Sequence, residues 1–234
     1  MTLPGAVRVV LLDIEGTTTP IAFVHERLFR YVRSHLATYV ANHWNDPPVQ
    51  DAIRQLNDDA ALQGRGLISD PETLLGVVHD LMDQDRKSGG LKTLQGLIWE
   101  DGYRAGELRG EVWDDVPVAF RRWRNEGREI AIYSSGSELA QRRLFESTGA
   151  GDLTPLITAF FDTRVGAKVE AGSYTKIAQA LGHPAPAILF VSDVTAELHA
   201  ARAAGLEVTL SIRPGNAPQA DAHLFPAVST LTGI

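Results

Sequence analysis

The chain has 234 residues, of which 44% are hydrophobic and 22% are charged, a balance typical of a globular protein with one core domain and an insertion. It contains no cysteine, which excludes disulfides, thiolate metal ligands and cysteine nucleophiles. The net charge is −7 with no basic stripe, so we expect no nucleic-acid partner. No apolar run approaches the roughly 20 residues of a membrane span. We therefore expect no membrane association and a cytoplasmic location, which the missing cysteines also fit.

The first half of the chain combines one buried strand with a long helical region. Residues 7–14 form a nearly continuous aliphatic run that predicts a strand buried on both faces. Apolar residues then recur at helical spacing in four stretches, about 23–40, 49–62, 71–82 and 91–103. Asp70 before Pro71 is a typical helix start, with aspartate as the N-cap. We predict that residues 21–112 form an α-helical cap inserted into a core made of residues 1–20 and 113–234.

The second half of the chain alternates between strands and helices. The predicted strands are 129–133, 159–161, 187–191 and 207–212, and the predicted helices end at Gly127, Ser147, Leu181 and Ala204. Alternation at this spacing indicates right-handed βαβ units. The predicted fold is therefore α/β, a Rossmann-like parallel sheet with helices on both faces. The proline-dotted tail after Pro214 is expected to wrap the core.

Polar side chains follow the predicted strands at the points where they end. Asp13 and Glu15 follow the first strand, Ser134 follows the second, and Asp193 follows the strand at 187–191. Lys168 lies in the loop after the short strand at 159–161. Ligands of open α/β sheets bind beyond the carboxyl ends of the strands. These side chains are therefore expected to meet at one rim.

The chemistry of this rim fits phosphoryl transfer. Asp13 and Asp193 would place two carboxylates close together, and either protonation or a divalent cation would relieve their repulsion. Oxygen ligands favour Mg2+, which also binds substrate phosphate. Ser134 and the backbone N–H groups after it can donate to phosphate oxygens, and Lys168 adds a positive charge. We predict an absolute requirement for Mg2+.

Four motifs together resemble the haloacid dehalogenase-like phosphatase superfamily. In chain order they are Asp13-Ile14-Glu15-Gly16-Thr17-Thr18, Ser134-Ser135-Gly136-Ser137, Lys168 and Ser192-Asp193. Each motif is weak alone, but four in order at the right strand ends are specific. The resemblance implies that Asp13 is a nucleophile that forms an aspartyl-phosphate.

Further motifs resemble the enolase-phosphatases of methionine salvage. They are the glutamate at position 15 where most of the superfamily has aspartate, the run Thr17-Thr18-Thr19-Pro20, the segment Ile98-Trp99-Glu100-Asp101-Gly102-Tyr103, the segment Gly106-Glu107-Leu108, and Gly172-Ser173-Tyr174. This likeness covers nearly the whole chain, cap included.

The resemblance implies a particular reaction and particular roles. The substrate would be a small phosphorylated diketone, 2,3-diketo-5-methylthiopentyl-1-phosphate, and the product the acireductone 1,2-dihydroxy-3-keto-5-methylthiopentene, formed by enolisation and then dephosphorylation. One Mg2+ per subunit would be held by Asp13, Glu15 and Asp193. Ser134, Ser135 and Lys168 would hold the phosphate, and Asp13 and Glu15 would be catalytic. A monomer is expected, with the helical insertion acting as a lid.

Several functional alternatives remain open at this stage. A receiver domain is also a parallel α/β domain with a phospho-accepting aspartate, Mg2+ and a lysine, but its acceptor ends a middle strand and it needs no insertion. Another sugar-phosphate or nucleotide phosphatase, or a phosphomutase, of the same superfamily would share every motif of the core. A hydrolytic dehalogenase needs no metal, and therefore no second acidic residue.

Individual residues also have alternative interpretations. Glu197, one helical turn after Asp193, either orients a metal-bound water or only favours the positive end of its helix. His25 either faces the site or lies outside it. Trp99 and Tyr103 fit the core of the cap better than substrate contacts. Residues 134–137 fit a helix N-cap as well as a phosphate site, because both use the same N–H groups.

Overall fold

The computed structural model of the chain describes residues 6–59, 66–84, 86 and 88–234. The chain divides into two compact units. Met1–Val24 and Arg109–Ile234 form the first, called the sheet unit here, and His25–Leu108 form the second, called the helical unit. The sequence placed the boundaries after residues 20 and 112, four residues from those of the structure. The last few residues of the predicted helical stretch at 49–62 lie outside the described residues.

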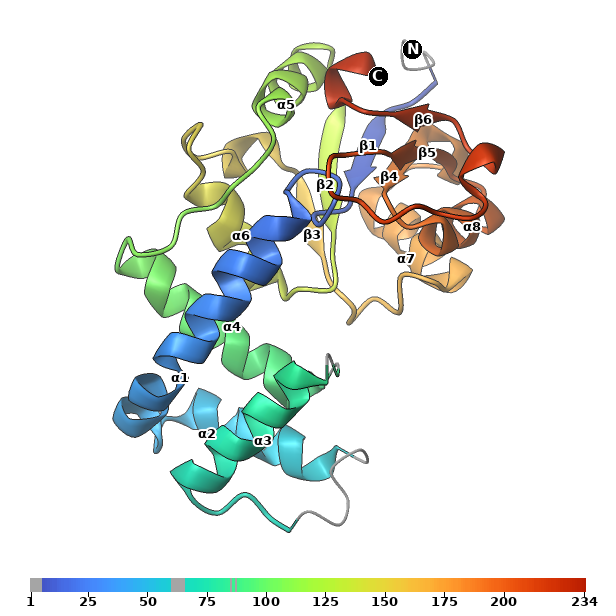
Figure 1. Ribbon diagram of the computed structural model, residues 1–234. Helices are drawn as coiled ribbons and strands as arrows, with labels where there is room; N and C mark the ends of the chain where they lie inside the picture. The colour runs from blue at the N-terminus through green and yellow to red at the C-terminus, as the bar shows by residue number, and fades with distance from the viewer. Residues whose placement is uncertain (1–5, 60–65, 85, 87) are drawn as a thin grey trace. The chain divides into compact units, whose positions relative to one another are not determined.

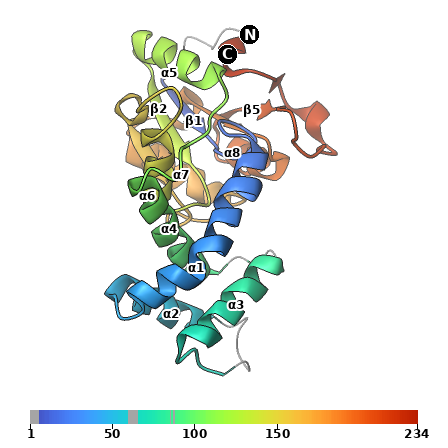
Figure 2. The same ribbon diagram turned by 60° about the vertical axis from the view of Figure 1, so that its left-hand side comes forward.

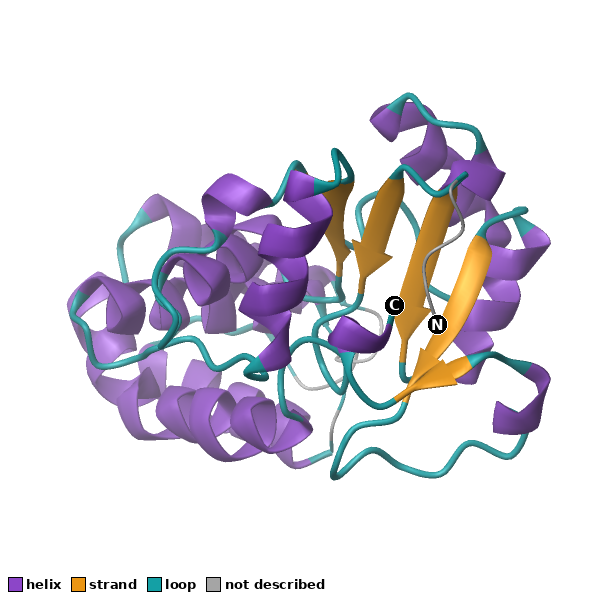
Figure 3. Cartoon of the chain, turned by 90° about the horizontal axis from the view of Figure 1, so that it is seen from above, coloured by secondary structure: helices purple, strands orange, loops and turns teal. Residues whose placement is uncertain are grey.

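The sheet unit contains one sheet of six parallel strands in the order β3-β2-β1-β4-β5-β6 (Figures 1 and 3). The strands are β1 (Val9–Leu12), β2 (Glu129–Tyr133), β3 (Ala159–Phe161), β4 (Ile188–Ser192), β5 (Glu207–Ser211) and β6 (Ala227–Val228). The predicted α/β class with a parallel sheet is confirmed. The sequence missed β6, which pairs with β5 after Pro226 and is only two residues long.

Strand β1 lies in the middle of the sheet because its residues can be buried on both faces. All four are buried, and Leu12 is paired with Ile132 on one side and Val191 on the other. Alternate side chains point to opposite faces. Val9 and Leu11 therefore pack together in one core cluster with residues of α7 (Ala171–Leu181) and α8 (Thr195–Ala203).

Helices α5 (Asp115–Asn125) and α6 (Glu138–Glu146) pack against β2 and β3. Figures 1 and 2 show them across the sheet from α7 and α8. Their aromatic residues fill the space, with the rings of Phe120 and Phe145 6.1 Å apart. The described residues of the unit also form four short 3-10 turns: η3 (Thr154–Leu156), η4 (Ala185–Ala187), η5 (Ala222–Leu224) and η6 (Leu231–Gly233). The prediction of helices on both faces of the sheet is therefore confirmed.

The helical unit is built around its own core. It contains α1 (Arg30–His43), α2 (Pro47–Asp58), α3 (Pro71–Asp83) and α4 (Gly89–Arg104), which Figure 2 shows together, preceded by a π-helical segment, η1 (Phe23–Phe29). Its apolar stripes meet in one cluster that includes Val32, Leu36, Leu56, Leu74 and Leu94. The predicted N-cap of α3 is confirmed, because Asp70 Oδ1 accepts a hydrogen bond from the N–H of Thr73 at 2.9 Å. The π-helical start of the first helix was not predicted.

None of the helices in the described part of the chain combines the length and apolar character that a membrane crossing requires.

Candidate active site

The site lies at the carboxyl ends of β1 and β4, where the order of the strands changes direction. From β1 the chain continues outward to β2 and β3, and it then returns to the other side of β1 as β4. Such a switch point leaves a crevice beyond the strand ends, because the connections on either side run away from it. Asp13 directly follows β1, and Asp193 directly follows β4. Both are buried, with 5% and 8% of their surfaces exposed.

Lys168 joins Asp13 to a second carboxylate. Its Nζ lies 2.5 Å from Asp13 Oδ1 and 2.7 Å from Glu197 Oε2, and all three side chains are at most 11% exposed. Burial alone would lower the pKa of Lys168, but the two carboxylates raise it above its ordinary value. The ammonium group is therefore held charged, in contact with the proposed nucleophile.

Glu197 is fixed from two sides. Its Oε2 also accepts a hydrogen bond from the Ser192 hydroxyl at 2.9 Å, and the same hydroxyl accepts one from the N–H of Val194 at 3.1 Å. Burial first and the charge of Asp13 next raise the pKa of Glu197, while Lys168 and Ser192 oppose the rise. Both interpretations of Glu197 from the sequence missed this contact with Lys168.

The site carries more negative than positive charge. Asp13, Asp193 and Glu197 are three buried carboxyl groups, and the ammonium of Lys168 balances one of them. Burial, followed by the charges of Asp13 and Glu197, raises the pKa of Asp193 to about 7. The carboxyl of Asp193 therefore binds a proton near neutral pH in the metal-free protein, and a bound cation would relieve the same repulsion.

Gly16 brings the loop after β1 close to Asp193. Its φ is +68°, which disfavours a side chain, and a β-carbon at this position would lie 2.6 Å from Cγ of Asp193 and 2.9 Å from Oδ1 of Asn216. The loop also closes on itself, since the Thr18 hydroxyl donates to the carbonyl of Asp13 at 3.1 Å. Only glycine leaves the space in which the Asp193 carboxylate lies.

The serine loop after β2 is held at both ends. The Ser134 hydroxyl accepts a hydrogen bond from the N–H of Gly136 at 3.3 Å, and Ser137 caps α6 by accepting from the N–H of Ala140 at 3.3 Å. Buried Gln141 donates to the carbonyls of Gly136 and Phe161, both at 2.8 Å, which ties the loop to β3. The predicted helix N-cap in this loop is confirmed, with Ser137 as the capping residue. The phosphate contacts of Ser134 and Ser135 stay predictions.

The backbone that carries Lys168 is held by three hydroxyl groups. Tyr133 donates to the carbonyl of Gly166 at 2.9 Å, Ser173 to that of Ala167 at 2.8 Å, and Tyr174 to that of Lys168 at 2.7 Å. Three successive carbonyls are thus fixed from β2 and α7. The sequence showed Ser173 and Tyr174 only as part of a motif, because a hydroxyl gives no sign of the distant carbonyl that it binds.

The acidic residues present fit a Mg2+ ion. Mg2+ in proteins is usually bound by one or two carboxylates, while waters and substrate phosphate supply the other ligands. Asp13 and Asp193 provide two buried carboxylates with an excess of negative charge. The Glu15 side chain, in contrast, is exposed. Within residues 6–59, 66–84, 86 and 88–234, no three His, Asp or Glu side chains are spaced to bind one metal together. The part of Glu15 in the metal site and in catalysis stays a prediction.

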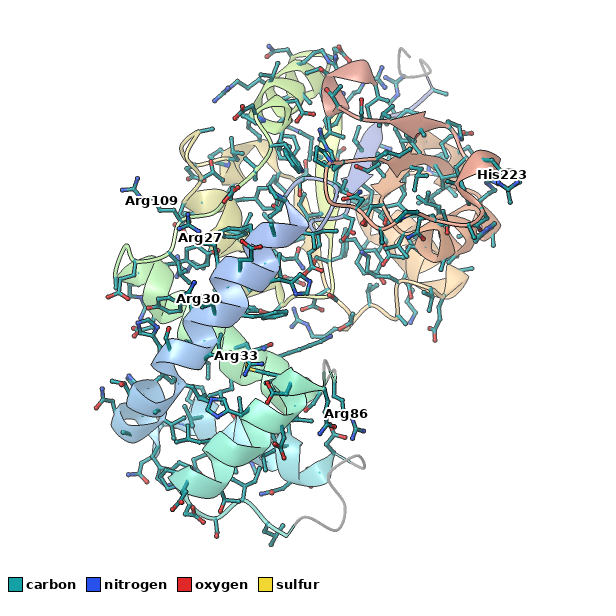
Figure 4. All side chains as sticks on the ribbon, viewed as in Figure 1. Arg27, Arg30, Arg33, Arg86, Arg109 and His223 are labelled. Atoms are coloured by element: carbon teal, nitrogen blue, oxygen red, sulfur yellow. The ribbon has the colours of Figure 1, made fainter. Side chains whose placement is uncertain are left out.

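The remaining candidate residues lie in the helical unit. The His25 side chain is exposed and its ring packs on Phe29 with centroids 5.5 Å apart. Trp99 stacks on the same Phe29 and donates to the carbonyl of Leu28 at 2.9 Å, so it belongs to the interior of this unit, as expected. Burial raises the pKa of Tyr103. The arginines labelled along η1 and α1 in Figure 4 are exposed, unlike Lys168.

Comparison with known proteins first defines the class. The profile of the haloacid dehalogenase-like hydrolases matches residues 7–205. Among solved structures, CbbY from Rhodobacter sphaeroides in complex with phosphate is similar with a TM-score of 0.60 at 16% identity, covering 96% of this chain and 95% of that one. At this identity the likeness shows the fold alone. Profile, fold and site together define a haloacid dehalogenase-like hydrolase, and phosphatases of this class generally use Mg2+.

The relatives then define the family. Enolase-phosphatase E1 of Synechococcus elongatus is 47% identical over 222 residues, 93% of each chain. Enolase-phosphatase E1 of Drosophila melanogaster is 44% identical, covering 92% of this chain and 86% of its own. The crystal structure of the UTR4 protein from Saccharomyces cerevisiae is similar with a TM-score of 0.79 and 33% identity, covering 96% and 98%. The chain therefore belongs to the enolase-phosphatases, haloacid dehalogenase-like phosphatases of methionine salvage.

Family membership excludes the receiver-domain alternative. Here Asp13, the first residue of the motif, follows β1, the first strand among the described residues, and the sequence of the helical unit lies between β1 and β2.

Proposed function

We propose that this enzyme converts 2,3-diketo-5-methylthiopentyl-1-phosphate to the acireductone 1,2-dihydroxy-3-keto-5-methylthiopentene by enolisation followed by dephosphorylation. The observation that carries the proposal is the buried contact between Lys168 and Asp13 beside Asp193. A nucleophile, a fixed positive charge and a second carboxylate are the parts that phosphoryl transfer requires. The identity to enolase-phosphatases over 93% of the chain supports the choice of substrate.

The covalent step follows from the position of Asp13. A carboxylate oxygen of Asp13 attacks the phosphorus atom, the bond between phosphorus and the substrate oxygen breaks, and an aspartyl-phosphate forms. Water then attacks this intermediate, releases inorganic phosphate and restores the carboxylate. Two easier displacements replace one difficult displacement. Lys168 Nζ, which lies 2.5 Å from Asp13, keeps the carboxylate oriented and reduces its repulsion of the anionic substrate.

The phosphate is held by groups from two separate loops, the loop after β3 and the loop between β2 and α6. Lys168 supplies the positive charge, and Ser134, Ser135 and the N–H groups at the start of α6 supply hydrogen-bond donors. The tie from Gln141 to β3 keeps the serine loop in place while phosphate enters and leaves. These contacts are proposed from the arrangement of the loops at the switch point.

We assign one Mg2+ per subunit to Asp13 and Asp193, with Glu15 contributing through its side chain, its backbone or a bound water. When bound, the cation neutralises phosphate oxygens and polarises the substrate carbonyl that becomes the enol. The excess of buried carboxylates and the glycine at position 16 support this assignment.

Glu15 is the candidate base for enolisation, the step that ordinary phosphatases lack. Its side chain is one methylene longer than the aspartate that most of the superfamily carries. A carboxylate next to the cation can remove a proton from the carbon between carbonyl and phosphate ester and return it to oxygen. The alternative is that Glu15 contributes only to the metal site and that another group is the base.

The helical unit is proposed as the cap that selects the substrate. Its four helices bury their apolar faces in a core of their own, and the sheet unit has a separate core. A lid of this kind excludes water and reads the methylthio group. We also propose that the enzyme is a cytoplasmic monomer. The absence of cysteine supports the location.

The proposal is tested by a phosphate-release screen of the purified enzyme with the diketo phosphate beside common sugar phosphates and nucleotides. Absorbance of the enol is followed in parallel. We expect phosphate release from the diketo compound to exceed that from every other ester by orders of magnitude. Equal rates with a sugar phosphate would favour the alternative, a general phosphatase of the same class.

A further inference from the structure

The chain segment after β5 reaches back to the loop that follows β1. The Ser211 hydroxyl donates to the carbonyl of Gly16 at 3.1 Å, and Asn216 Nδ2 donates to the same carbonyl at 3.0 Å. Arg213 Nε donates to the carbonyl of Thr17 at 3.1 Å. Two adjacent carbonyls of the loop that carries Asp13 are therefore held by side chains about 200 residues away in sequence.

Arg213 is itself fixed by a buried ion pair. Its two terminal nitrogens lie 3.1 and 2.9 Å from the oxygens of Asp115, at the start of α5, and one also donates to the carbonyl of Ser229 at 2.8 Å. The guanidinium lies over the ring of Trp113, 5.5 Å from its centroid, and the Arg213 side chain is only 4% exposed. A planar group with five donors suits this arrangement, and lysine could not replace it.

Asn216 connects this segment to the acidic side of the site. Its Nδ2 also donates to the carbonyl of Ser211 at 3.1 Å, so the amide closes the turn on which it lies. Its Oδ1 is buried and has no hydrogen-bond partner. A β-carbon at Gly16 would be 2.9 Å from this oxygen and 2.6 Å from Cγ of Asp193, so the amide and the carboxylate lie against the same glycine.

We infer that the segment Ser211–Asn216 is a positioning clamp for the loop after β1, and that Asn216 is the residue through which the clamp sets the geometry between that loop and Asp193. The inference rests on the proposed Mg2+ site at Asp13 and Asp193. Two donors on the carbonyl of Gly16 fix the position of the Gly16 α-carbon. That position determines how closely the Asp193 carboxylate approaches the loop that begins at Asp13.

The unpartnered Oδ1 of Asn216 gives the clamp a second part. A buried acceptor without a donor is costly unless a donor arrives with the ligand. If Asp13 and Asp193 hold a cation, a water molecule bound to that cation could donate a hydrogen bond to Oδ1 of Asn216. Groups that orient ligands in this way change metal affinity by about 10–100-fold when they are removed.

The test compares Mg2+ binding with stability in the whole protein. Mg2+ binding is measured by titration calorimetry without substrate, and the thermal midpoint is measured in EDTA. Asn216→Ala is expected to weaken Mg2+ binding at least tenfold and to lower kcat while KM for the phosphate ester changes little. The midpoint in EDTA should fall by only about 2–4 °C, because Gly16 keeps the bond from Ser211. Ser211→Ala, which removes that other bond, should weaken binding in the same direction.

Asn125→Ala is the matched control, because Asn125 is exposed at the end of α5. It should leave Mg2+ binding and the midpoint unchanged. If Asn216→Ala lowered the midpoint and left Mg2+ affinity unchanged, the residue would be structural only and the inference would be overturned. Asp193→Asn tests the metal site independently of the clamp. If it kept wild-type Mg2+ affinity, the metal site itself would be misplaced, and the clamp would fall with it.

Discussion

Lys168 and Glu197 form a buried ion pair with Nζ and Oε2 2.7 Å apart. The pair lies directly beside the contact between Lys168 and Asp13, so one ammonium group bridges two carboxylates. Glu197 helps to determine where the lysine lies, and through the lysine it orients Asp13. Ser192 fixes Glu197 in turn.

Glu197→Gln is expected to lower kcat by about 10–100-fold, because Lys168 loses one of the two carboxylate charges that hold it and small displacements of catalytic groups have effects of this size. The thermal midpoint should hold or rise, because the variant removes one carboxylate from a site that has a surplus. Steady-state kinetics and a thermal melt measure both. Glu207→Gln, at an exposed position at the start of β5, is the control and should change neither. Wild-type kcat in Glu197→Gln would contradict the positioning role.

Gly16→Ala is expected to disturb stability and Mg2+ binding together. A left-handed residue other than glycine costs about 1–2 kcal/mol, and here the methyl group would also overlap the Asp193 carboxylate. Gly127→Ala is a matched control, because its φ is +73° and nothing lies within 4 Å of a β-carbon there. The control should lose stability only. Thermal melts with and without Mg2+ distinguish a loss of stability from a loss of Mg2+ binding. If Mg2+ raised the midpoint equally in Gly16→Ala and Gly127→Ala, the proposed overlap between position 16 and the Asp193 carboxylate would be contradicted.

Mg2+ binding is expected to weaken as the pH falls below about 7. The pKa of Asp193 is raised from 3.8 to about 7, so below that pH the cation must displace a proton. Affinity should therefore fall by about tenfold per pH unit on the acid side. Calorimetric titrations on either side of neutrality measure this dependence. In Asp193→Asn, any residual Mg2+ binding should no longer depend on pH in this range.

The stability of the metal-free protein should depend on pH in the opposite direction to its Mg2+ affinity. Between the unfolded pKa of 3.8 and the folded value of about 7, the folded state binds a proton that the unfolded state does not. Stability in EDTA should therefore fall as the pH rises through this window. Thermal melts in EDTA measure the trend, and a rise in stability over the same range would show that Asp193 does not control it.

Asp13→Asn is expected to abolish turnover, because an amide oxygen is a poor nucleophile and the covalent intermediate cannot form. The fold should persist, as judged by circular dichroism, although the ion pair with Lys168 is lost. Asp114→Asn is the control, since Asp114 precedes α5 without a side-chain capping bond. Phosphate release above background in Asp13→Asn would exclude covalent catalysis at this residue.

Glu15→Asp tests whether the longer carboxylate moves the proton. If it does, enol formation followed by absorbance should fall much further than hydrolysis of a phosphate ester that needs no enolisation, because the shorter side chain no longer reaches the carbon. Equal losses in the two assays would instead favour a role in the metal site alone.

The strands of the core were predictable because a strand that is buried on both faces is a nearly continuous run of apolar residues. Val9–Leu12 and Ile188–Ser192 are buried throughout, and such strands read as apolar runs. Strand β6 gave no such pattern, because Ala227–Val228 are two residues at the edge of the sheet and not buried. The helix N-cap at Asp70 was predictable for a different reason. Its bond to Thr73 is local, and local bonds depend on neighbouring sequence.

The site was predictable only as far as strand ends could be located. Asp13 and Asp193 follow buried strands that lie side by side, so their proximity follows from the topology. The roles of Glu197, Tyr174 and Asn216 depend on side chains meeting across the fold, and no spacing in the sequence encodes these contacts. Glu15 was expected among the metal ligands; it is exposed in the structure, and its part in the metal site stays a prediction.

The clamp from Ser211–Asn216 to the loop after β1 has a consequence for the order of events during synthesis. Asp13 leaves the ribosome well before the donors to the carbonyls of Gly16 and Thr17, which are made about 200 residues later. Strand β1 must also wait for β2, since Val9 pairs with Glu129. The helical unit has its own core and can fold while β1 is still unpaired. A nascent chain that stops before Ser211 would therefore carry every motif of the phosphatase and still lack the contacts that hold the loop after β1, so activity should appear only once Ser211–Asn216 have been synthesised.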